Sequence, residues 1–293
     1  MGGLDLYLAT CARLPRLDAD DQGLLAALQA RRLRVEPAVW DDPQVEWGAA
    51  RAVLVRSTWD YERRRAEFLG WAERVPVPLW NPPQVLRWNT HKRYLMEMAA
   101  DGLPVVPTRL LAPGDEAGLE AALSDWPDAV LKPAVGAGAR GAFLARRDGL
   151  EATRAHGRAL LAAGEDVLVQ PYRQAVEREG ELSLLYFAGQ LSHAVQKRPA
   201  RGEWRIQEVW GGTRHPIEAP PGTPELAARF LAWAQARERA AEALLYARVD
   251  LLPGPAGWEL GELELTEPSL YLREGGVGAA GRLADAIAAR LTR

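Results

Sequence analysis

The stretch that decides the fold is Gly261-Glu-Leu-Glu-Leu-Thr-Glu-Pro268, which follows Ala247-Arg-Val-Asp-Leu-Leu252 along the chain. Side chains alternate between the two faces of a β-strand, so Glu262 and Glu264 share one face. Like charges this close need a cation between them, and a hard divalent ion with oxygen ligands meets that need. We therefore predict a magnesium site that carries a nucleotide's phosphates. From this segment alone, a solvent-facing strand of an amphipathic sheet fits equally well.

Bulk composition narrows the class of protein. The chain has 293 residues, of which 48% are hydrophobic, and this predicts a globular protein of two or three sub-domains. The net charge of -3 gives no reason to expect a nucleic-acid partner. Cys11 is the only cysteine, which excludes an internal disulfide and favours a buried thiol after the first strand. No apolar run approaches the ~20 residues that span a bilayer, so we expect no membrane partner and a cytoplasmic location.

The N-terminal third reads as a small doubly wound domain that ends near Asn81-Pro-Pro83. Apolar patterning predicts strands at 5–10, 35–40 and 52–56 and helices at 18–32 and 61–75. Binding loops in such sheets follow the carboxyl ends of the strands. The residues expected there to contact the substrate are Arg56, Ser57, Thr58 and Asp60.

The rest of the chain reads as α+β. Strands are predicted at 105–111, 129–133, 142–146 and 167–172, with a hairpin formed by 181–187 and 190–198 around Ala188-Gly189. Helices are predicted at 89–102, 116–123, 150–162, 224–246 and 277–291.

A glycine-rich loop separates two of these strands, in the sequence Lys132-Pro-Ala-Val-Gly-Ala-Gly-Ala-Arg-Gly141. Gly136, Gly138 and Gly141 would let backbone amides approach a phosphate chain, and Lys132 adds a point charge. No Gly-Lys-Ser/Thr follows, so the loop is not a Walker A motif, and it leads into a strand rather than a helix. We predict a flexible flap over phosphates; an ordinary β-turn is the alternative.

In this order, these elements resemble the ATP-grasp superfamily, in its glutathione synthetase-like branch of carboxylate–amine ligases, from about residue 80 onward. The resemblance implies an α/β, overall α+β, ATP-grasp fold whose two α+β sub-domains clasp the nucleotide. The implied domains are a pre-ATP-grasp substrate domain at 1–83, a small sub-domain with the flap at 84–168, and a C-terminal sub-domain with the metal site at 169–293.

The resemblance also implies a cofactor site for ATP and Mg²⁺. The implied ATP contacts are Lys92, Lys132, Gly136, Gly138, Gly141, Gln170, Tyr172 and Glu181. The implied metal ligands are Asp250, Glu262 and Glu264. Glu264 stands where many relatives have asparagine, a change that keeps an oxygen ligand and adds charge.

Five shorter motifs are similar to a subgroup that contains the O-ureido-serine cyclo-ligase of cycloserine biosynthesis. These motifs are Arg56-Ser-Thr-Trp-Asp-Tyr61, Trp88-Asn-Thr-His-Lys-Arg-Tyr94, Gly180-Glu-Leu-Ser183, Leu191-Ser-His-Ala-Val-Gln-Lys197 and Glu264-Leu-Thr-Glu-Pro268. From this we carry over the reaction type and leave the acid open.

The expected activity is an ATP- and Mg-dependent carboxylate–amine ligase, or an intramolecular cyclo-ligase, that acts on a small amino-acid-like acid through an acyl phosphate. A carboxylate is a poor electrophile until ATP phosphorylates it, and cations then stabilise the developing charge. We expect Arg273, Lys197 and Arg205 to act in catalysis and His193 to contact the substrate. The alternatives are a non-catalytic nucleotide-binding sensor or scaffold and, more weakly, a small-molecule kinase. We allow for a homo-oligomer.

Overall fold

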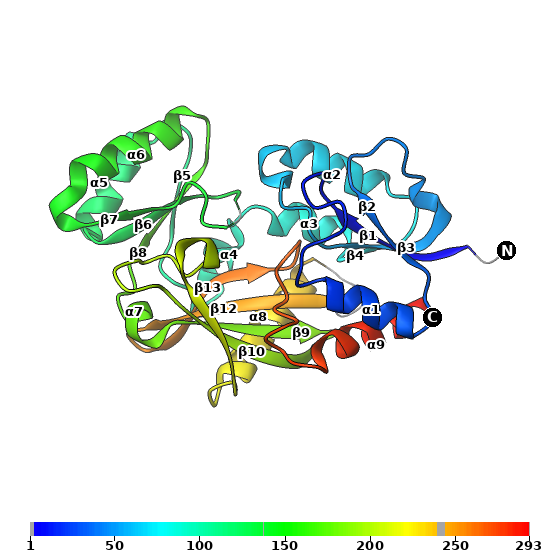
Figure 1. Ribbon diagram of the computed structural model, residues 1–293. Coiled ribbons are helices and arrows are strands. Elements are labelled where there is room, and N and C mark those ends of the chain that lie inside the picture. Colours follow the sequence, from blue (N-terminus) through cyan, green and yellow to red (C-terminus); the bar gives the residue numbers. More distant parts are fainter. Residues whose placement is uncertain (1–2, 137, 239–243, 293) are drawn as a thin grey trace.

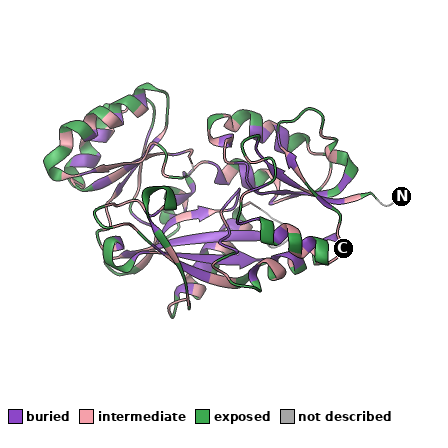
Figure 2. Cartoon of the chain, viewed as in Figure 1, coloured by how far each residue is buried: buried purple, intermediate pink, exposed green. Residues whose placement is uncertain are grey.

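The computed structural model describes residues 3–136, 138–238 and 244–292 and contains three β-sheets, each built from its own part of the chain (Figure 1). Figure 2 shows buried residues concentrated in the strands and exposed residues on the outer faces of the helices. None of the helices in the described ranges is both long and apolar enough to cross a bilayer.

The first sheet is parallel, with the strand order β2-β1-β3-β4. Its strands are β1 (Leu4–Thr10), β2 (Val35–Val39), β3 (Ala50–Val55) and β4 (Leu79–Trp80). Alternate residues of β3 face opposite cores: Leu54 packs with α1 (Gln22–Ala30) and α9 (Ala279–Leu291), and Val55 packs with α2 (Arg65–Arg74). The sheet is therefore covered by helices on both faces, as a doubly wound domain requires. Cys11 follows β1 as a buried free thiol, as predicted.

The second sheet is antiparallel, with the order β5-β8-β6-β7. Its elements are β5 (Arg109–Leu111), β6 (Ala129–Pro133), β7 (Phe143–Ala145) and β8 (Val167–Pro171), with the helices α5 (Glu116–Asp125) and α6 (Leu150–Ala162). Both helices lie on the outer side of this sheet (Figure 1). Their buried leucines Leu119 and Leu161 pack on Leu131 of β6 and form a separate core.

The third sheet is also antiparallel, with the order β11-β10-β9-β12-β13. Its strands are β9 (Glu181–Phe187), β10 (Gln190–Arg198), β11 (Thr213–Ile217), β12 (Tyr246–Gly254) and β13 (Gly257–Glu264). One face is apolar: Leu184, Val249 and Leu263 pack with Phe230 of α8 (Thr223–Arg237). The hairpin of β9 and β10 has the predicted limits. The acids of β12 and β13 occupy the opposite face.

Two helix predictions are wrong. The helix predicted at 89–102 begins only at Tyr94, as α4 (Tyr94–Ala100), and the preceding helix α3 (Pro83–Asn89), which has proline at its first position, was not predicted. The residues between them leave the helix, and the backbone N–H of Lys92 donates to Ala134 O at 2.9 Å. The predicted helix 224–246 ends at Arg237, and Tyr246 instead begins β12, where it pairs with β9.

A smaller difference concerns the predicted strand 105–111. Only β5 joins the sheet, and Val105 makes an isolated parallel bridge to Leu260. The predicted helix 61–75 begins with a separate turn before α2. The remaining short elements are α7 (Val176–Glu179) and the 3₁₀ turns η1 (Trp47–Ala49), η2 (Tyr61–Arg63), η3 (Arg147–Gly149) and η4 (Glu208–Trp210).

Candidate active site

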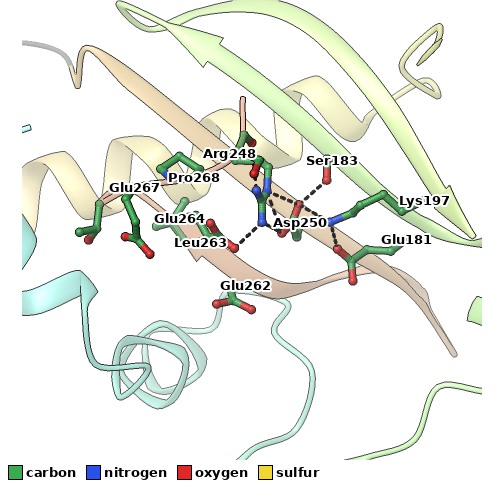
Figure 3. A network of polar contacts seen from close by, with 12 residues as sticks. Glu181, Ser183, Lys197, Arg248, Asp250, Glu262, Leu263, Glu264, Glu267 and Pro268 are labelled. Carbon is green, nitrogen blue, oxygen red and sulfur yellow. Dashed lines mark hydrogen bonds and ion pairs between the residues drawn. The ribbon is translucent and has the colours of Figure 1, made fainter. Parts of the chain in front are cut away.

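The register of β12 and β13 gathers charge on one face of the third sheet. Asp250 lies opposite Glu262, and Arg248 lies opposite Glu264. On the other side of β12, Ser183 of β9 lies opposite Asp250. The intervening apolar residues point to the other face, so the alternation of acids with leucines is a two-faced strand. Figure 3 shows these side chains on the same side of the sheet.

Asp250 is the most heavily bonded of these acids. Nε of Arg248 lies 3.1 Å from both carboxylate oxygens of Asp250, and Nζ of Lys197 lies 3.2 Å from Oδ1. The hydroxyl of Ser183 donates to the same Oδ1 (Figure 3). Burial alone would raise the pKa of Asp250, but Arg248 and Lys197 outweigh it and lower the pKa to about 2. Asp250 is therefore ionised at neutral pH.

Two cations connect Asp250 to its neighbours. Lys197 also pairs with Glu181, and Arg248 also pairs with Glu264. Burial acts to lower the pKa of Lys197, but Asp250 and Glu181 outweigh it and raise the pKa. Burial raises the pKa of Glu181 despite Lys197. Arg248 was not among the predicted site residues, although its position two residues before Asp250 on one strand puts both on one face.

Glu262 faces the two lysines that come from earlier in the chain. Nζ of Lys92 lies 3.0 Å from Oε1 of Glu262 and donates to Gly136 O at 2.8 Å. Burial would raise the pKa of Glu262, but Lys92 and Lys132 lower it. The ammonium group of Lys132 has no hydrogen bond or ion pair with any described residue, and burial lowers its pKa. An anion placed between these lysines would satisfy Lys132.

The cluster carries more negative charge than its cations neutralise. Burial, with added repulsion from Glu262 and Asp250, raises the pKa of Glu264 to about 7 even though Arg248 opposes the shift. Burial and the neighbouring Glu264 raise the pKa of Glu267 to about 8. Carboxyl groups in this state gain from an incoming cation.

These oxygen donors fit a magnesium ion that arrives with nucleotide. Within the described part of the chain, no three His, Cys, Asp or Glu side chains are already gathered closely enough to hold a metal. Magnesium does not need such a cage, because it is usually held by one or two carboxylates together with phosphate oxygens and water. Glu262 and Glu264 can supply those carboxylates. Asp250 is already bonded to Arg248 and Lys197, so it would have to share its oxygens.

The glycine loop closes toward the N-terminal domain. Gly138 and Gly141 have φ of 64° and 72°, in the region that favours glycine. A Cβ at Gly141 would lie 2.9 Å from the ring of Pro133. Nε of Arg140 lies 2.6 Å from Oε1 of Glu62 in η2, so the loop is tied to the first domain. Residue 137 lies outside the described residues.

Two of the implied ATP contacts, Gln170 and Tyr172, lie at the end of β8. Nε2 of Gln170 donates to Oγ1 of Thr108 at 2.9 Å. The hydroxyl of Tyr172 donates to Glu177 at 2.7 Å, and the guanidinium of Arg146 lies 4.7 Å from its ring centre. Both predicted side chains are thus held by protein groups.

The predicted substrate residues of the N-terminal domain form a buried joint. Arg56 is 2% exposed; its Nε donates to Asp21 and its Nη2 donates to Pro268 O, both at 2.9 Å. Ser57 donates to the same carboxylate. Thr58 is fully buried and its hydroxyl has no partner within the described residues. Arg56 therefore connects this domain to the loop that follows β13, and Ser57 holds Asp21, the carboxylate that pairs with Arg56.

Asp60 lies at the edge of that joint. One of its carboxylate oxygens accepts a hydrogen bond from Nε1 of Trp40 at 2.9 Å, and the residue is partly exposed. It is the most accessible of the four substrate residues predicted in the N-terminal domain.

The loop after β13 brings further groups to the acids. Nε2 of His193 lies 3.0 Å from Leu270 O and 3.1 Å from Tyr271 O, so this ring holds the loop rather than facing solvent. The ring centre of Tyr271 is 5.1 Å from the guanidinium of Arg248, 5.7 Å from Nζ of Lys197 and 5.0 Å from the guanidinium of Arg214. Tyr271 and Arg214 were not among the predicted site residues, because they belong to none of the motifs that predicted the site.

A cavity of about 320 Å³ lies beside Tyr271. It is lined by Glu208, Arg214, Arg273 and Glu274. Arg214 is paired with both glutamates, whereas the side chain of Arg273 is exposed and pairs with no described residue. A larger cavity of about 420 Å³ includes no member of the acidic cluster; it is bordered by residues 72–84, Leu244 and Arg290.

Arg205 is the one predicted catalytic cation that the structure leaves apart from the acids. Its Nη2 pairs with Glu203 at 2.7 Å, and its guanidinium lies 3.4 Å from the ring centre of Trp210. These contacts are all within the segment between β10 and β11. Lys197, in contrast, lies inside the cluster, and Arg273 lies at the neighbouring cavity.

The chain is similar to known proteins over nearly its whole length. A family model described as the N-terminal domain of the D-cycloserine synthetase DcsG matches residues 6–81. The cycloserine biosynthesis protein DcsG of Streptomyces lavendulae is 36% identical to this chain, and the match covers 98% of each. The crystal structure of D-cycloserine synthetase DcsG matches with a TM-score of 0.88 and 34% identity, over 98% of this chain and 99% of the other.

Less similar structures share the fold. The D-alanine–D-alanine ligase from Bacillus anthracis, complexed with ATP, matches with a TM-score of 0.68 at 14% identity, over 99% of this chain and 98% of the other. The ATP-grasp ligase PsnB, complexed with a variant precursor, Mg and ADP, matches with a TM-score of 0.63 at 18% identity, over 99% of each chain. The predicted ATP-grasp fold is thereby confirmed.

Proposed function

The chain belongs to the DcsG family of ATP-grasp ligases, and on that premise we propose that it activates a small amino-acid-like acid as an acyl phosphate. It is an ATP-dependent ligase that forms C–N bonds, as its relatives are. A nitrogen then attacks the acyl carbon and phosphate leaves. This chemistry needs no nucleophile from the protein, and none is assigned.

One observation carries the proposal: the Lys132 ammonium has no partner within the described residues, although it lies in the field of Glu262 beside Lys92. An unpaired, partly buried ammonium is costly unless an anion meets it. A metal-bound triphosphate has both of the charges that this crevice lacks. Its phosphates would contact Lys92 and Lys132, and its metal would contact Glu262 and Glu264, with Asp250 as the third ligand.

The cations of the cluster have separate roles in the proposal. Arg248 and Lys197 lie on one face with the acids and would stabilise charge on the transferring phosphoryl group and on the tetrahedral oxyanion. Bound magnesium would neutralise charge on the phosphoryl oxygens. The flap at Gly136, Gly138 and Gly141 would cover the phosphates and exclude water from the acyl phosphate. Gln170, Tyr172 and Glu181 remain our candidates for holding the nucleoside.

We assign the substrate to the cavity beside Tyr271. Among the described residues, the guanidinium of Arg273 has no partner and can bind a carboxylate, and the buried Oε2 of Glu274 has none and can accept from an ammonium group. Such a pair suits an amino-acid-like zwitterion. In this proposal Arg56, Ser57, Thr58 and Asp60 shape the wall from the N-terminal side. His193 positions the loop, and Arg205 is no longer assigned to catalysis.

The relatives named for cycloserine formation make ring closure within one molecule the form of the reaction to test first. The experiment measures ADP release with ATP, Mg²⁺ and a panel of serine-derived acids, with and without added amines. Stimulation by an acid alone, with loss of water from the product mass, supports cyclo-ligation. Hydroxylamine should trap the acyl phosphate as a hydroxamate. A stable phosphorylated product would favour a kinase, and tight nucleotide binding with no stimulated ADP release would refute the proposal.

A further inference from the structure

The outer edge of β13 is closed by side chains from the segment between the first two domains. β13 is the last strand of its sheet, so the backbone groups of Leu263 and Leu265 that point away from β12 have no strand to pair with. These groups are buried and would need partners. Side chains of Asn81, Asn89 and Tyr94 provide them.

Asn89 forms hydrogen bonds with the residues before and after Glu264. Its Nδ2 donates to Leu263 O at 2.8 Å, and its Oδ1 accepts from the N–H of Leu265 at 2.8 Å and from the hydroxyl of Thr266 at 3.2 Å. The hydroxyl oxygen of Tyr94 accepts from the N–H of Leu263 at 3.1 Å. Asn89 is 7% exposed and Tyr94 is 1% exposed, so water does not substitute for them.

Lys92 lies between these two residues in the sequence and contacts the neighbouring acid. Its ammonium is 3.0 Å from Glu262 and bonds to Gly136 O, while its backbone bonds to Ala134 O. One short segment, residues 89–94, therefore holds the acidic strand on one side and the base of the flap on the other. In the proposed mechanism only Lys92 of this segment contacts the nucleotide, so Asn89 and Tyr94 have no role there.

We propose that Asn89 and Tyr94 are positioning residues for the metal site, which fix β13 in the register that turns Glu262 and Glu264 into the crevice. They touch neither nucleotide nor metal in this account. The inference rests on the proposed function, because it assigns the two glutamates to magnesium. Partners that orient metal ligands commonly affect metal affinity by about 10- to 100-fold.

Asn81 offers a matched control. It is also a fully buried asparagine with three hydrogen bonds: Nδ2 donates to Tyr246 O and Leu265 O, and Oδ1 accepts from the N–H of Leu245, each at 2.9 Å. Asn81 bonds only to Leu265 after Glu264 and to Leu245 and Tyr246, whereas Asn89 bonds to the residues both before and after Glu264. Removing either asparagine should lower the melting temperature similarly, and only Asn89 should alter the metal site.

The test measures ADP binding by calorimetry with excess Mg²⁺ and with EDTA, for the wild type, Asn89→Ala, Tyr94→Phe and Asn81→Ala. We expect wild-type ADP to bind more tightly with Mg²⁺. In Asn89→Ala, the ratio of the ADP affinity with Mg²⁺ to that with EDTA should fall roughly tenfold or more. The ADP affinity with EDTA should not change. Tyr94→Phe removes one hydrogen-bond acceptor, so its loss of the magnesium increment should be smaller than that of Asn89→Ala. This variant provides the test if Asn89→Ala does not fold.

Two results would overturn the inference: a full magnesium increment in folded Asn89→Ala or Tyr94→Phe, or an equal loss in Asn81→Ala. A wild type with no magnesium increment is a different failure, because it refutes the proposed metal site itself and the inference with it. The same titrations therefore separate the two claims.

Discussion

Two clusters of buried charge in this chain differ in how completely they are paired. In the joint between the N-terminal domain and the loop after β13, the charge of Arg56 is paired with that of Asp21, although its Nη1 has no hydrogen-bond partner within the described residues. Nη2 of Arg56 also donates to Pro268 O, and the hydroxyl of Ser57 donates to Asp21. On the face of β12 and β13, Lys132 has no partner within the described chain and Glu264 has a pKa near 7. Buried charge that pairs internally holds parts of a protein together, whereas unpaired charge indicates a ligand.

The largest expected effect is at Lys132, whose charge is unpaired within the described chain. Lys132→Met keeps the length of the side chain and removes its charge, so kcat/KM for ATP should fall by about 10²- to 10³-fold, the usual cost of losing a group that stabilises developing charge. Steady-state ADP release measures this loss. The melting temperature should stay the same or rise, because the ammonium has no partner to lose.

Near-normal turnover in Lys132→Met would place the phosphates elsewhere. Arg154→Met is a suitable control, because Arg154 pairs with Glu120 on the outside of the second domain. It should leave kcat/KM unchanged.

A substitution in the joint around Arg56 should lower the free energy of unfolding. Arg56→Met leaves Asp21 buried without its cation, and breaking one half of a buried ion pair commonly costs about 3–5 kcal/mol. Urea unfolding of the metal-free protein measures this loss. The double variant Arg56→Met with Asp21→Leu should recover part of it, since no buried charge then remains unpaired.

If Arg56→Met is as stable as the wild type but loses substrate binding, the comparison is wrong and Arg56 belongs to the substrate site. Nucleotide binding of the folded variant with Mg²⁺ should match the wild type in either case. A loss of ATP affinity would contradict the separation of the two clusters.

These clusters also show what the sequence can and cannot predict. The pattern of Glu262, Leu263 and Glu264 predicted a two-faced strand, because alternation is local information. The pairing of Arg248 with Asp250 and Glu264 was missed, since it depends on the register of β12 against β13. Long-range pairing likewise explains Arg56, whose partner Asp21 lies 35 residues away.

Helix limits failed for similar reasons. One helix was predicted to start at Asn89, but the segment at Lys92 bonds to Ala134 and α4 starts at Tyr94. The other was predicted to continue past Arg237 to Tyr246, but Tyr246 is held by strand pairing to Phe187. Tertiary hydrogen bonds overrode local propensity at both places. The hairpin of β9 and β10 was predicted within its limits because a local turn at Ala188-Gly189, where both residues have positive φ, sets it.

A smaller effect should follow from Arg273, the free cation at the cavity beside Tyr271. Arg273→Gln should raise the KM for the acid by about tenfold, in the range of one charge-assisted hydrogen bond, and leave the KM for ATP unchanged. Glu203→Gln, in the separate ion pair with Arg205, is the control and should change neither. An equal rise in both KM values for Arg273→Gln would move this residue from the substrate to the nucleotide.

The smallest and most specific effect concerns pH. Burial and the neighbouring carboxylates hold the pKa of Glu264 at about 7, so the metal-free protein keeps a proton there that magnesium must displace. The magnesium increment in ADP binding should weaken by up to about tenfold per pH unit below 7 and level off above 8. Calorimetry between pH 5.5 and pH 8.5 measures this slope.

In the absence of metal, the free energy of unfolding should fall as the pH rises, whereas the magnesium increment rises. The folded pKa of Glu264 exceeds the ordinary glutamate pKa of 4.5, so the folded state binds more protons between these values and loses stability as pH rises through about 7. Glu264→Gln keeps an oxygen ligand and removes the titration, so it should flatten both profiles. If the slope persists unchanged in Glu264→Gln, the titrating group is another one, and Glu267, with a pKa of about 8, is the next to substitute.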